Sequence, residues 1–213
     1  MEINELILGS TSPFRSQILR QAKVDQFRQI APQVDESSVC QESPILCAED
    51  RSKLKAKAMF SETNAIAITG DQVLEYKGKV FNKARNRPEA FAILRTLSGE
   101  RHHLHSAYTI SLIQKNQPVT ILKSSIVSTT MWMKDLSDRE IDVYLDSGEW
   151  EGCAGCYQFE NLGVHLFKKI EGESSAIMGL PMPQILHDLR TFGVNLLLAP
   201  QGPWTLNESV PMT

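Results

Sequence analysis

The sequence AIAITGDQV at residues 65–73 contains the feature around which the rest of the chain can be arranged. Its four apolar residues, 65–68, predict a short buried strand, and Asp71 follows where that strand should end. Open α/β sheets bind their ligands at the carboxyl ends of such strands. A carboxylate there can bind a metal ion or accept a proton, although Asp beside Gly is equally typical of an ordinary turn. The role of Asp71 therefore depends on which other residues the fold brings to it.

The composition is that of a globular protein with a substantial core. The chain has 213 residues, of which 42% are hydrophobic, and this suits one domain or two closely packed lobes. A formal net charge of −3 offers no broad basic surface, so we expect no nucleic-acid partner. No apolar run approaches the roughly 20 residues of a membrane span, and the acidic N-terminus lacks the basic start of a signal peptide. We therefore expect a cytoplasmic protein with no membrane partner.

Cysteine and histidine residues give only weak indications of a zinc or redox centre. Cys153 and Cys156 form an isolated C-x-x-C pair, whereas a zinc site needs a second pair and a redox motif needs a thioredoxin-like setting. Strand alternation puts His103 and His105 on one face of a strand and His102 on the other. We therefore expect structural or surface roles for these histidines.

Residues 6–22 predict a strand, a polar turn and a helix in succession. An apolar run ends at the turn GSTSP, and apolar residues then recur at helical spacing over 14–22. Ser12 is a natural N-cap with Pro13 in the first helical position, so Arg15 falls in the first turn. Hydroxyls, backbone N–H groups and a guanidinium then converge where the helix dipole favours an anion. The segment predicts a phosphate-binding turn, with an ordinary capped helix and a solvated arginine as the alternative.

Acidic and basic side chains follow in the next two segments. A second strand is expected at residues 27–30, and the polar loop after it carries Asp35 and Glu36, which could serve a metal ion or be solvated loop acids. Residues 44–60 show helical periodicity and carry several lysines, among them Lys55. These lysines form a solvated basic face, or one of them turns inward to a phosphate.

The remaining pattern alternates strands and helices. Further strands are expected at residues 73–76 and 79–81, which form a hairpin, at 103–113 and 119–133, which form an antiparallel pair, and at 164–168. Helices are expected at residues 87–97, 138–147 and 183–192, the second of which begins with an S-x-x-E capping box. Residues beyond 200 resemble a loose tail. We therefore expect a single domain over residues 1–200 and a tail at 201–213.

Together these segments resemble the Maf family of nucleoside triphosphate pyrophosphatases, which is named after a septum-formation protein. The resemblance covers about residues 6–194. Its most specific parts are LGSTSPFR at 8–15, which is similar to the family's opening LASxSPRR, and GDQ at 70–72. It implies an α/β fold with a mixed, twisted sheet flanked by helices and two lobes around a central cleft, like that of inosine triphosphatases. It also implies a homodimer.

The resemblance implies that the protein hydrolyses a nucleoside triphosphate to the monophosphate and pyrophosphate with a divalent metal ion, Mg²⁺ or Mn²⁺. Matched by position, Asp71 is the catalytic aspartate and a metal ligand, and Glu36 is the second metal ligand. The residues expected to bind the substrate are Ser10, Ser12, Arg15, Lys55, Gln72, Lys83 and Glu160. Cationic groups are required because a triphosphate carries about four negative charges, which must be neutralised before water can attack phosphorus.

Several positions depart from the best-known branch of the family, which acts on dTTP and UTP. Phe14 replaces the first arginine of the opening, and the tripeptide at 82–84 is Asn-Lys-Ala where Gly-Lys-Pro is usual. Cys153 stands where that branch has lysine, and Glu160 where it has glutamine. A glutamate facing the base can accept hydrogen bonds from guanine or attract a methylated cationic purine. These residues favour 7-methyl-GTP as the substrate; the alternatives are the dTTP/UTP activity and a non-enzymatic, nucleotide-binding regulator of septum formation.

Overall fold

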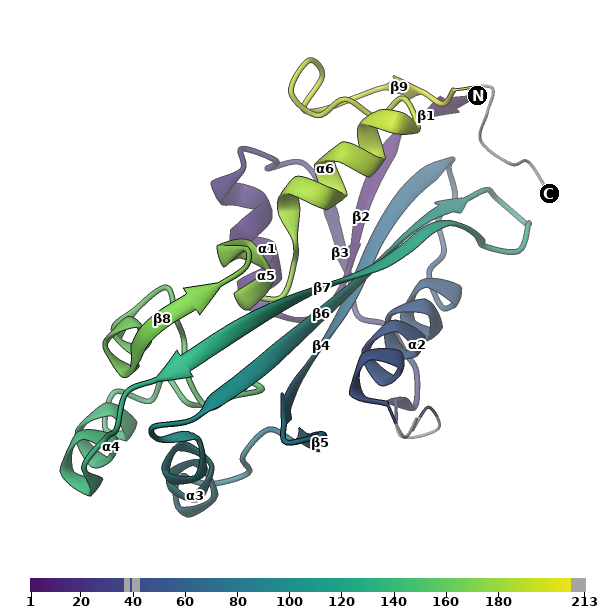
Figure 1. Cartoon of the computed structure of the whole chain (residues 1–213). Coiled ribbons are helices and arrows are strands. Elements are labelled where there is room, and N and C mark those ends of the chain that lie inside the picture. Colours follow the sequence, from purple (N-terminus) through teal and green to yellow (C-terminus); the bar gives the residue numbers. More distant parts are fainter. Residues whose placement is uncertain (37–38, 40–42, 208–213) are drawn as a thin grey trace.

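A mixed, seven-stranded sheet forms the centre of the molecule in a computed structural model that describes residues 1–36, 39 and 43–207 (Figure 1). The strand order is β3-β2-β4-β6-β7-β8, and β5 pairs with β4. β2 lies parallel to β3 and β4, whereas the other pairs are antiparallel. The strands are β2 (Glu5–Gly9), β3 (Arg28–Ile30), β4 (Ala65–Tyr76), β5 (Lys79–Phe81), β6 (Arg101–Ile113), β7 (Thr120–Met133) and β8 (Phe167–Glu171). The expected mixed α/β sheet is confirmed.

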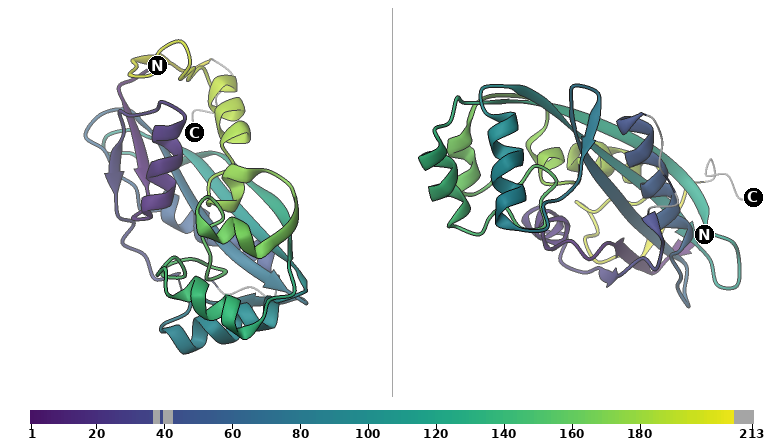
Figure 2. Two further views of the ribbon diagram at one scale, coloured as in Figure 1. Left: turned by 90° about the vertical axis from the view of Figure 1, so that its left-hand side faces the viewer. Right: turned by 90° about the horizontal axis from the view of Figure 1, so that it is seen from below.

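Helices cover both faces of this sheet. They are α1 (Pro13–Gln21), α2 (Pro44–Lys57), α3 (Arg87–Leu97), α4 (Asp138–Leu145), α5 (Ser174–Ile177) and α6 (Met182–Thr191). Figures 1 and 2 show α1 and α6 on one face, α2 on the other, and α3 and α4 at one end of the long strands. None of these described helices has both the length and the apolar character needed to cross a membrane.

Alternate residues of β4 explain how the two faces are filled. Ile66 and Ile68 pack into one buried cluster with residues of α1 and α6, whereas Ala67 packs into a cluster on the opposite face. Val73 is also on that opposite face, where it packs against Ala48 of α2. Neighbouring side chains on a strand point to opposite faces, so β4 supports both helical layers.

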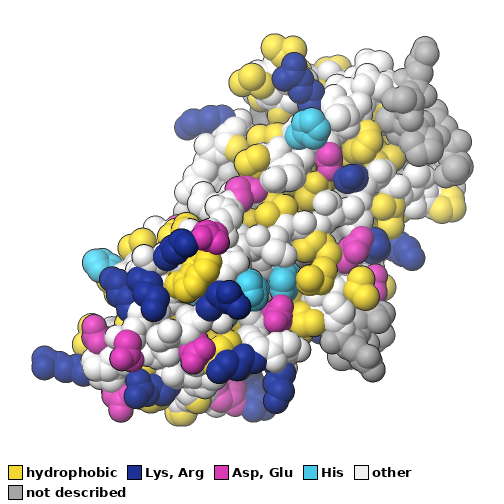
Figure 3. All heavy atoms as spheres, viewed as in Figure 1, with side chains coloured by type: hydrophobic (Ala, Val, Ile, Leu, Met, Phe, Trp, Pro, Cys, Tyr) yellow, Lys and Arg dark blue, Asp and Glu magenta, His cyan; other side chains and the backbone are white. Residues whose placement is uncertain are grey.

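The two largest hydrophobic cores define two lobes. The first lies between the sheet and helices α1 and α6, and the second joins α3 and α4 to the far end of β4 and β6 through residues such as Leu74 and Leu104. Charged side chains of both signs are intermixed over the second lobe (Figure 3), where Arg87 of α3 pairs with Asp142 and Asp146 at 2.9 Å each. Because β4 contributes to both cores, one continuous strand links the lobes. The two-lobed prediction is confirmed.

Asp71 lies in the middle of β4 and not, as the sequence indicated, beyond the end of a short strand. The parallel ladder with β2 stops at Gly9 and Thr69, but the antiparallel ladder with β6 continues as far as Glu75. This pairing keeps the Gly-Asp segment extended although its composition is typical of a turn. Asp71 nevertheless sits just past the carboxyl end of β2, which is the edge where a ligand site was expected.

Two segments near the C-terminus differ from the expectations. The strand predicted at 164–168 is present as β8 but begins at Phe167, because the residues before it form a 3₁₀ helix, Leu162–Leu166. Within the expected tail, β9 (Trp204–Thr205) pairs with β1 (Glu2–Ile3) and Trp204 is only 4% exposed, whereas residues 208–213 lie outside the described part of the chain. In both segments, contacts with distant parts of the chain decide the conformation.

Candidate active site

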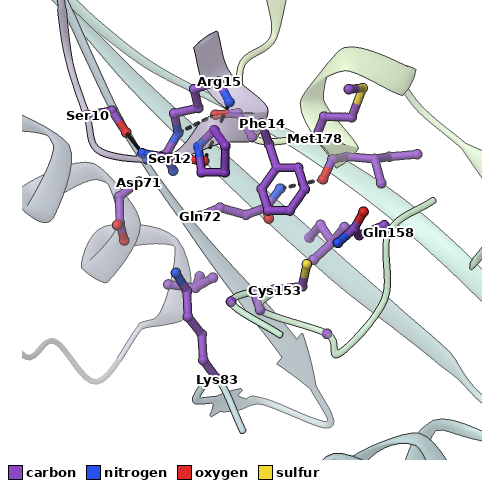
Figure 4. Close-up of a pocket in the computed structure, with 18 of the residues that line it drawn as sticks. Ser10, Ser12, Phe14, Arg15, Asp71, Gln72, Lys83, Cys153, Gln158 and Met178 are labelled. Carbon is purple, nitrogen blue, oxygen red and sulfur yellow. Dashed lines mark hydrogen bonds between the residues drawn. The ribbon is translucent and has the colours of Figure 1, made fainter. Parts of the chain in front are cut away.

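A cavity of about 660 Å³ lies where the two lobes meet. That volume is in the range of small-molecule sites. Residues from the first turn of α1, from β4, from the loop after β5 and from the loop at 151–160 line it. All nine predicted site residues are among them: Ser10, Ser12, Arg15, Glu36, Lys55, Asp71, Gln72, Lys83 and Glu160. Figure 4 draws 18 of the lining residues and labels ten, six of which belong to this predicted set.

The turn before α1 is built as a network of hydroxyl groups around Arg15. Ser12 caps the helix, because its side chain accepts from the Arg15 backbone N–H, and Ser10 accepts from the Ser12 N–H at 3.1 Å. The Arg15 guanidinium donates to Ser10 Oγ at 3.1 Å and to the Gly179 carbonyl at 3.0 Å. Burial lowers the pKa of Arg15 from its usual value, and the charges of Asp71 and Glu36 oppose this effect. The cap and its arginine are therefore held at the cavity wall, where Figure 4 shows them.

Lys55 joins the two acids that were predicted to bind metal. Its Nζ lies 2.8 Å from Asp71 Oδ1 and 2.9 Å from Glu36 Oε2. The Lys55 and Asp71 side chains are 9% and 10% exposed, whereas Glu36 is 45% exposed. Of the two alternatives for the lysines of α2, Lys55 thus turns inward, and Lys57 is exposed. A buried ammonium between two carboxylates reduces the repulsion between their negative charges.

Arg51 is a site residue that the sequence reasoning missed. Its Nη1 lies 4.0 Å from Asp71 Oδ2, and it lines the cavity. Arg51 precedes Lys55 by four residues, so the two side chains share one face of α2. This spacing would have indicated Arg51 once Lys55 was assigned to the site.

Gln72 points to the other face of β4 from Asp71. Its Nε2 lies 2.9 Å from Ser106 Oγ, from the Ala176 carbonyl and from the Ile177 carbonyl. These contacts attach α5 to the sheet, next to the Gly179 carbonyl that holds Arg15. Gln72 lines the cavity, but its amide nitrogen supports the cavity wall; contact with substrate stays a prediction.

The loop at 153–160 forms the opposite side of the cavity (Figure 4). Burial raises the pKa of Cys153 to about 12, with a further contribution from the Glu160 carboxylate, while Lys83 lowers it. Burial, and then the neighbouring Glu149, raises the pKa of Glu160. A protonated thiol of this kind is a poor nucleophile, which agrees with the weak expectation of a redox role. Lys83 and Glu160 are thus close to Cys153.

A buried pair fixes this loop to β6. His102 Nε2 lies 2.8 Å from the Tyr157 hydroxyl, and burial lowers the pKa of His102 to about 4. His103 and His105 lie on the other face of β6, with their rings 6.0 Å apart, as the alternation predicted. A Cβ on Gly155 would lie 2.3 Å from the Tyr157 ring, so the loop needs glycine there to pass the tyrosine.

The two acids have the oxygen ligands that a divalent ion uses. Asp71 Oδ2 is buried and has no hydrogen-bond partner among the described residues, which is a costly state for a carboxylate oxygen. The described part of the chain contains no group of three or more His, Cys, Asp or Glu residues that could hold a metal ion. Mg²⁺ commonly binds through one or two carboxylates together with substrate phosphates. Asp71 and Glu36 match that mode of binding.

Comparisons with known proteins identify the family of the chain. A family model described as "Maf-like protein" matches residues 5–192. A "Nucleoside triphosphate pyrophosphatase" of Rhodopseudomonas palustris (strain BisB5) is 38% identical over 193 residues, which cover 87% of this chain and 93% of the relative. A "7-methyl-GTP pyrophosphatase" of Colwellia psychrerythraea is 32% identical, over 90% of this chain and 94% of the relative. A "dTTP/UTP pyrophosphatase" of Vibrio cholerae is 33% identical, over 88% of this chain and 99% of the relative.

Proposed function

Since the chain belongs to the Maf-like protein family, we infer that it is a nucleoside triphosphate pyrophosphatase, which forms the nucleoside monophosphate and pyrophosphate. The observation that carries this conclusion is the convergence of the predicted phosphate-binding and acidic residues on one cavity. A capped helix start, buried cations and two carboxylates at one place are the groups that phosphoanhydride hydrolysis requires.

The cavity has a phosphate end and a base end. We place the triphosphate between the α1 turn, with Arg15, and the cations of α2, because these groups supply hydroxyl, N–H and guanidinium donors. Lys83 reaches the same space from the loop after β5. The nucleoside then extends towards the loop at 153–160, across the cavity from Ser10 and Asp71.

Asp71 acts as the general base in this proposal. It takes a proton from a water molecule whose oxygen bonds to the α-phosphorus, and the bond from that phosphorus to the bridging oxygen breaks to release pyrophosphate. Held by Asp71 and Glu36, a divalent ion would neutralise negative charge on the phosphates. Proton transfer by a positioned side chain typically increases the rate by roughly 10²–10⁴-fold.

We propose that the protein prefers 7-methyl-GTP to pyrimidine nucleotides. Glu160 places a half-buried carboxylate at the base end, and a carboxylate accepts hydrogen bonds from the guanine N1–H and amino group and attracts the positive charge of a methylated purine. The relatives named for 7-methyl-GTP and for dTTP/UTP are 32% and 33% identical to this chain, so their likeness does not separate the two substrates. The support for this preference is therefore Glu160 itself.

A nucleotide panel tests both parts of the proposal. We expect pyrophosphate release with Mg²⁺ or Mn²⁺, and the highest kcat/KM for 7-methyl-GTP among 7-methyl-GTP, dTTP, UTP and CTP. Asp71→Asn should lower kcat by roughly 10²–10⁴-fold, whereas Asp25→Asn, at an exposed position, should leave it unchanged. Full activity in Asp71→Asn would contradict the mechanism. Glu160→Gln should reduce the preference for 7-methyl-GTP; an unchanged ranking of the four nucleotides would contradict the role of Glu160.

A further inference from the structure

The Lys55 ammonium occupies the space between the two carboxylates that the proposed reaction assigns to a divalent ion. Its hydrogen bond to Asp71 Oδ1 is 2.8 Å long, and its contact with Glu36 Oε2 is 2.9 Å. In the structure the two acids therefore share a single positive group. A divalent ion held by the same oxygens would have to replace that group, because two cations so close together repel each other strongly.

Lys55 contacts only one of the two oxygens of Asp71. Oδ1 accepts from Lys55, and Oδ2 is buried, with Arg51 Nη1 4.0 Å away. Glu36, by contrast, is 45% exposed and stands at the rim of the pair. An ion approaching from the cavity can reach Glu36, but it cannot bind Glu36 Oε2 and Asp71 Oδ1 together until Lys55 moves.

The surroundings allow the Lys55 side chain to move while α2 stays in place. The helix is fixed to the sheet through Ser52, whose Oγ lies 2.8 Å from Thr109 Oγ1 and whose carbonyl accepts from Thr69 Oγ1 at 2.9 Å. The lysine, however, has a flexible four-carbon stem and a compact charge. It borders the same cavity as the other expected phosphate ligands, so phosphate oxygens offer its ammonium an alternative partner.

We propose that Lys55 is a resident cation that withholds Asp71 and Glu36 from a divalent ion until nucleotide phosphate draws the ammonium away. The inference rests on the proposed function, since it uses the same acids and the same phosphate site. Its consequence is that metal ion and nucleotide bind interdependently, because each favours the state in which Lys55 has left the carboxylates. In the free protein the two acids then keep Lys55 as their shared partner and bind metal ion only weakly.

Binding of Mn²⁺ alone, followed by electron paramagnetic resonance on the nucleotide-free protein, tests this inference. Lys55→Met should raise the affinity for Mn²⁺ by about tenfold or more, because it removes the competing charge. Lys57→Met is the matched control: it removes the same charge from an exposed position on the same helix and should leave the affinity unchanged. Equal affinities in the two variants, or a lower one in Lys55→Met, would overturn the inference.

A second readout uses the non-hydrolysable analogue α,β-methylene-GTP. In the wild type the analogue should raise the Mn²⁺ affinity strongly. In Lys55→Met the analogue should raise it less, and the decrease should be about the factor by which the substitution raises the Mn²⁺ affinity of the nucleotide-free protein. If the analogue raised the Mn²⁺ affinity by the same factor in both proteins, the proposed role of Lys55 would be contradicted. These measurements need no turnover, so they can succeed or fail independently of the hydrolysis assay.

The wild type provides a test that does not depend on the stability of Lys55→Met. The NMR signal of the Lys55 ammonium group, identified by its loss in Lys55→Arg, should shift when Mg²⁺ saturates the nucleotide-free protein. The shift is required because the ion and the ammonium compete for the same oxygens. Saturation with Mg²⁺ that leaves this signal in place would refute the proposal.

Discussion

Lowering the pH from about 7.5 to about 4.5 should destabilise the protein through His102. In the folded state this buried imidazole has a pKa of about 4, whereas in an unfolded chain its pKa is 6.5. Between these values the unfolded chain binds a proton that the folded protein excludes, so the free energy of unfolding falls as the pH decreases from 6.5 towards 4. The difference between the two pKa values of His102 corresponds to a decrease of about 3 kcal/mol in the free energy of unfolding.

Urea denaturation of the wild type and of His102→Phe over this pH range measures the effect. At neutral pH the variant should be less stable by about 1–3 kcal/mol, because the Tyr157 hydroxyl loses its buried partner. This deficit should shrink or reverse by about pH 4.5, since only the wild type has a buried imidazole whose protonation opposes folding. Burial raises the pKa of Glu160 and Glu173, so these two acids make the free energy of unfolding increase as the pH decreases. This contribution is the same in the wild type and in His102→Phe, so it does not affect the difference between them.

A matched variant completes the experiment. His165→Gln alters an exposed imidazole on the 3₁₀ helix and should leave the pH dependence of the wild type unchanged. If wild type and His102→Phe lose stability in parallel between about pH 7 and 4.5, the buried-imidazole argument is refuted.

Three further predictions concern the walls of the cavity and the C-terminal segment. Gln72→Leu removes the contacts that hold α5, so it should lower the free energy of unfolding by about 1–3 kcal/mol; a higher KM with unchanged stability would instead indicate that Gln72 binds substrate. Gly70→Ala places a Cβ 3.0 Å from the Ala107 carbonyl and 3.5 Å from Arg15 Nε. We therefore expect thermal melts to show a free energy of unfolding that is lower by about 1–3 kcal/mol, and calorimetry to show weaker binding of α,β-methylene-GTP. Trp204→Ala should lower the free energy of unfolding by about 3–5 kcal/mol, because Trp204 is buried in the first core. An unchanged melting temperature would show that Trp204 contributes little to stability.

Features that depend on a few neighbouring residues could be predicted from the sequence. The Ser12 cap and the capping box of Ser137 and Glu140 each involve partners three residues apart. The hairpin at Lys77 and Gly78 has positive φ at both turn positions, which is the conformation that joins tightly paired strands. In such cases the local chemistry is enough to specify the conformation. The expected homodimer and cytoplasmic location, by contrast, stay predictions.

The cavity itself could be predicted as a set of residues but not as an arrangement. The resemblance named nine residues, and all nine line one cavity. It did not reveal that Lys55 lies between Asp71 and Glu36, or that the Gln72 amide is committed to α5. These contacts join residues that are 16 to 104 positions apart, so they exist only after the strands and helices have packed.

Asp71 shows most clearly what the sequence determines by itself and what the tertiary structure decides. Residues 65–73 alone place a carboxylate near the end of an apolar run, because that pattern depends on adjacent side chains. Whether the Gly-Asp segment turns or stays extended depends on backbone pairing with β6, whose residue Ala107 stands opposite Asp71. Strand pairing satisfies backbone N–H and C=O groups that a buried turn would leave without partners, and this energy outweighs the local preference of Gly and Asp for a turn. The same pairing aims Asp71 at Lys55, so long-range hydrogen bonding turns an ordinary acidic residue into the centre of the site.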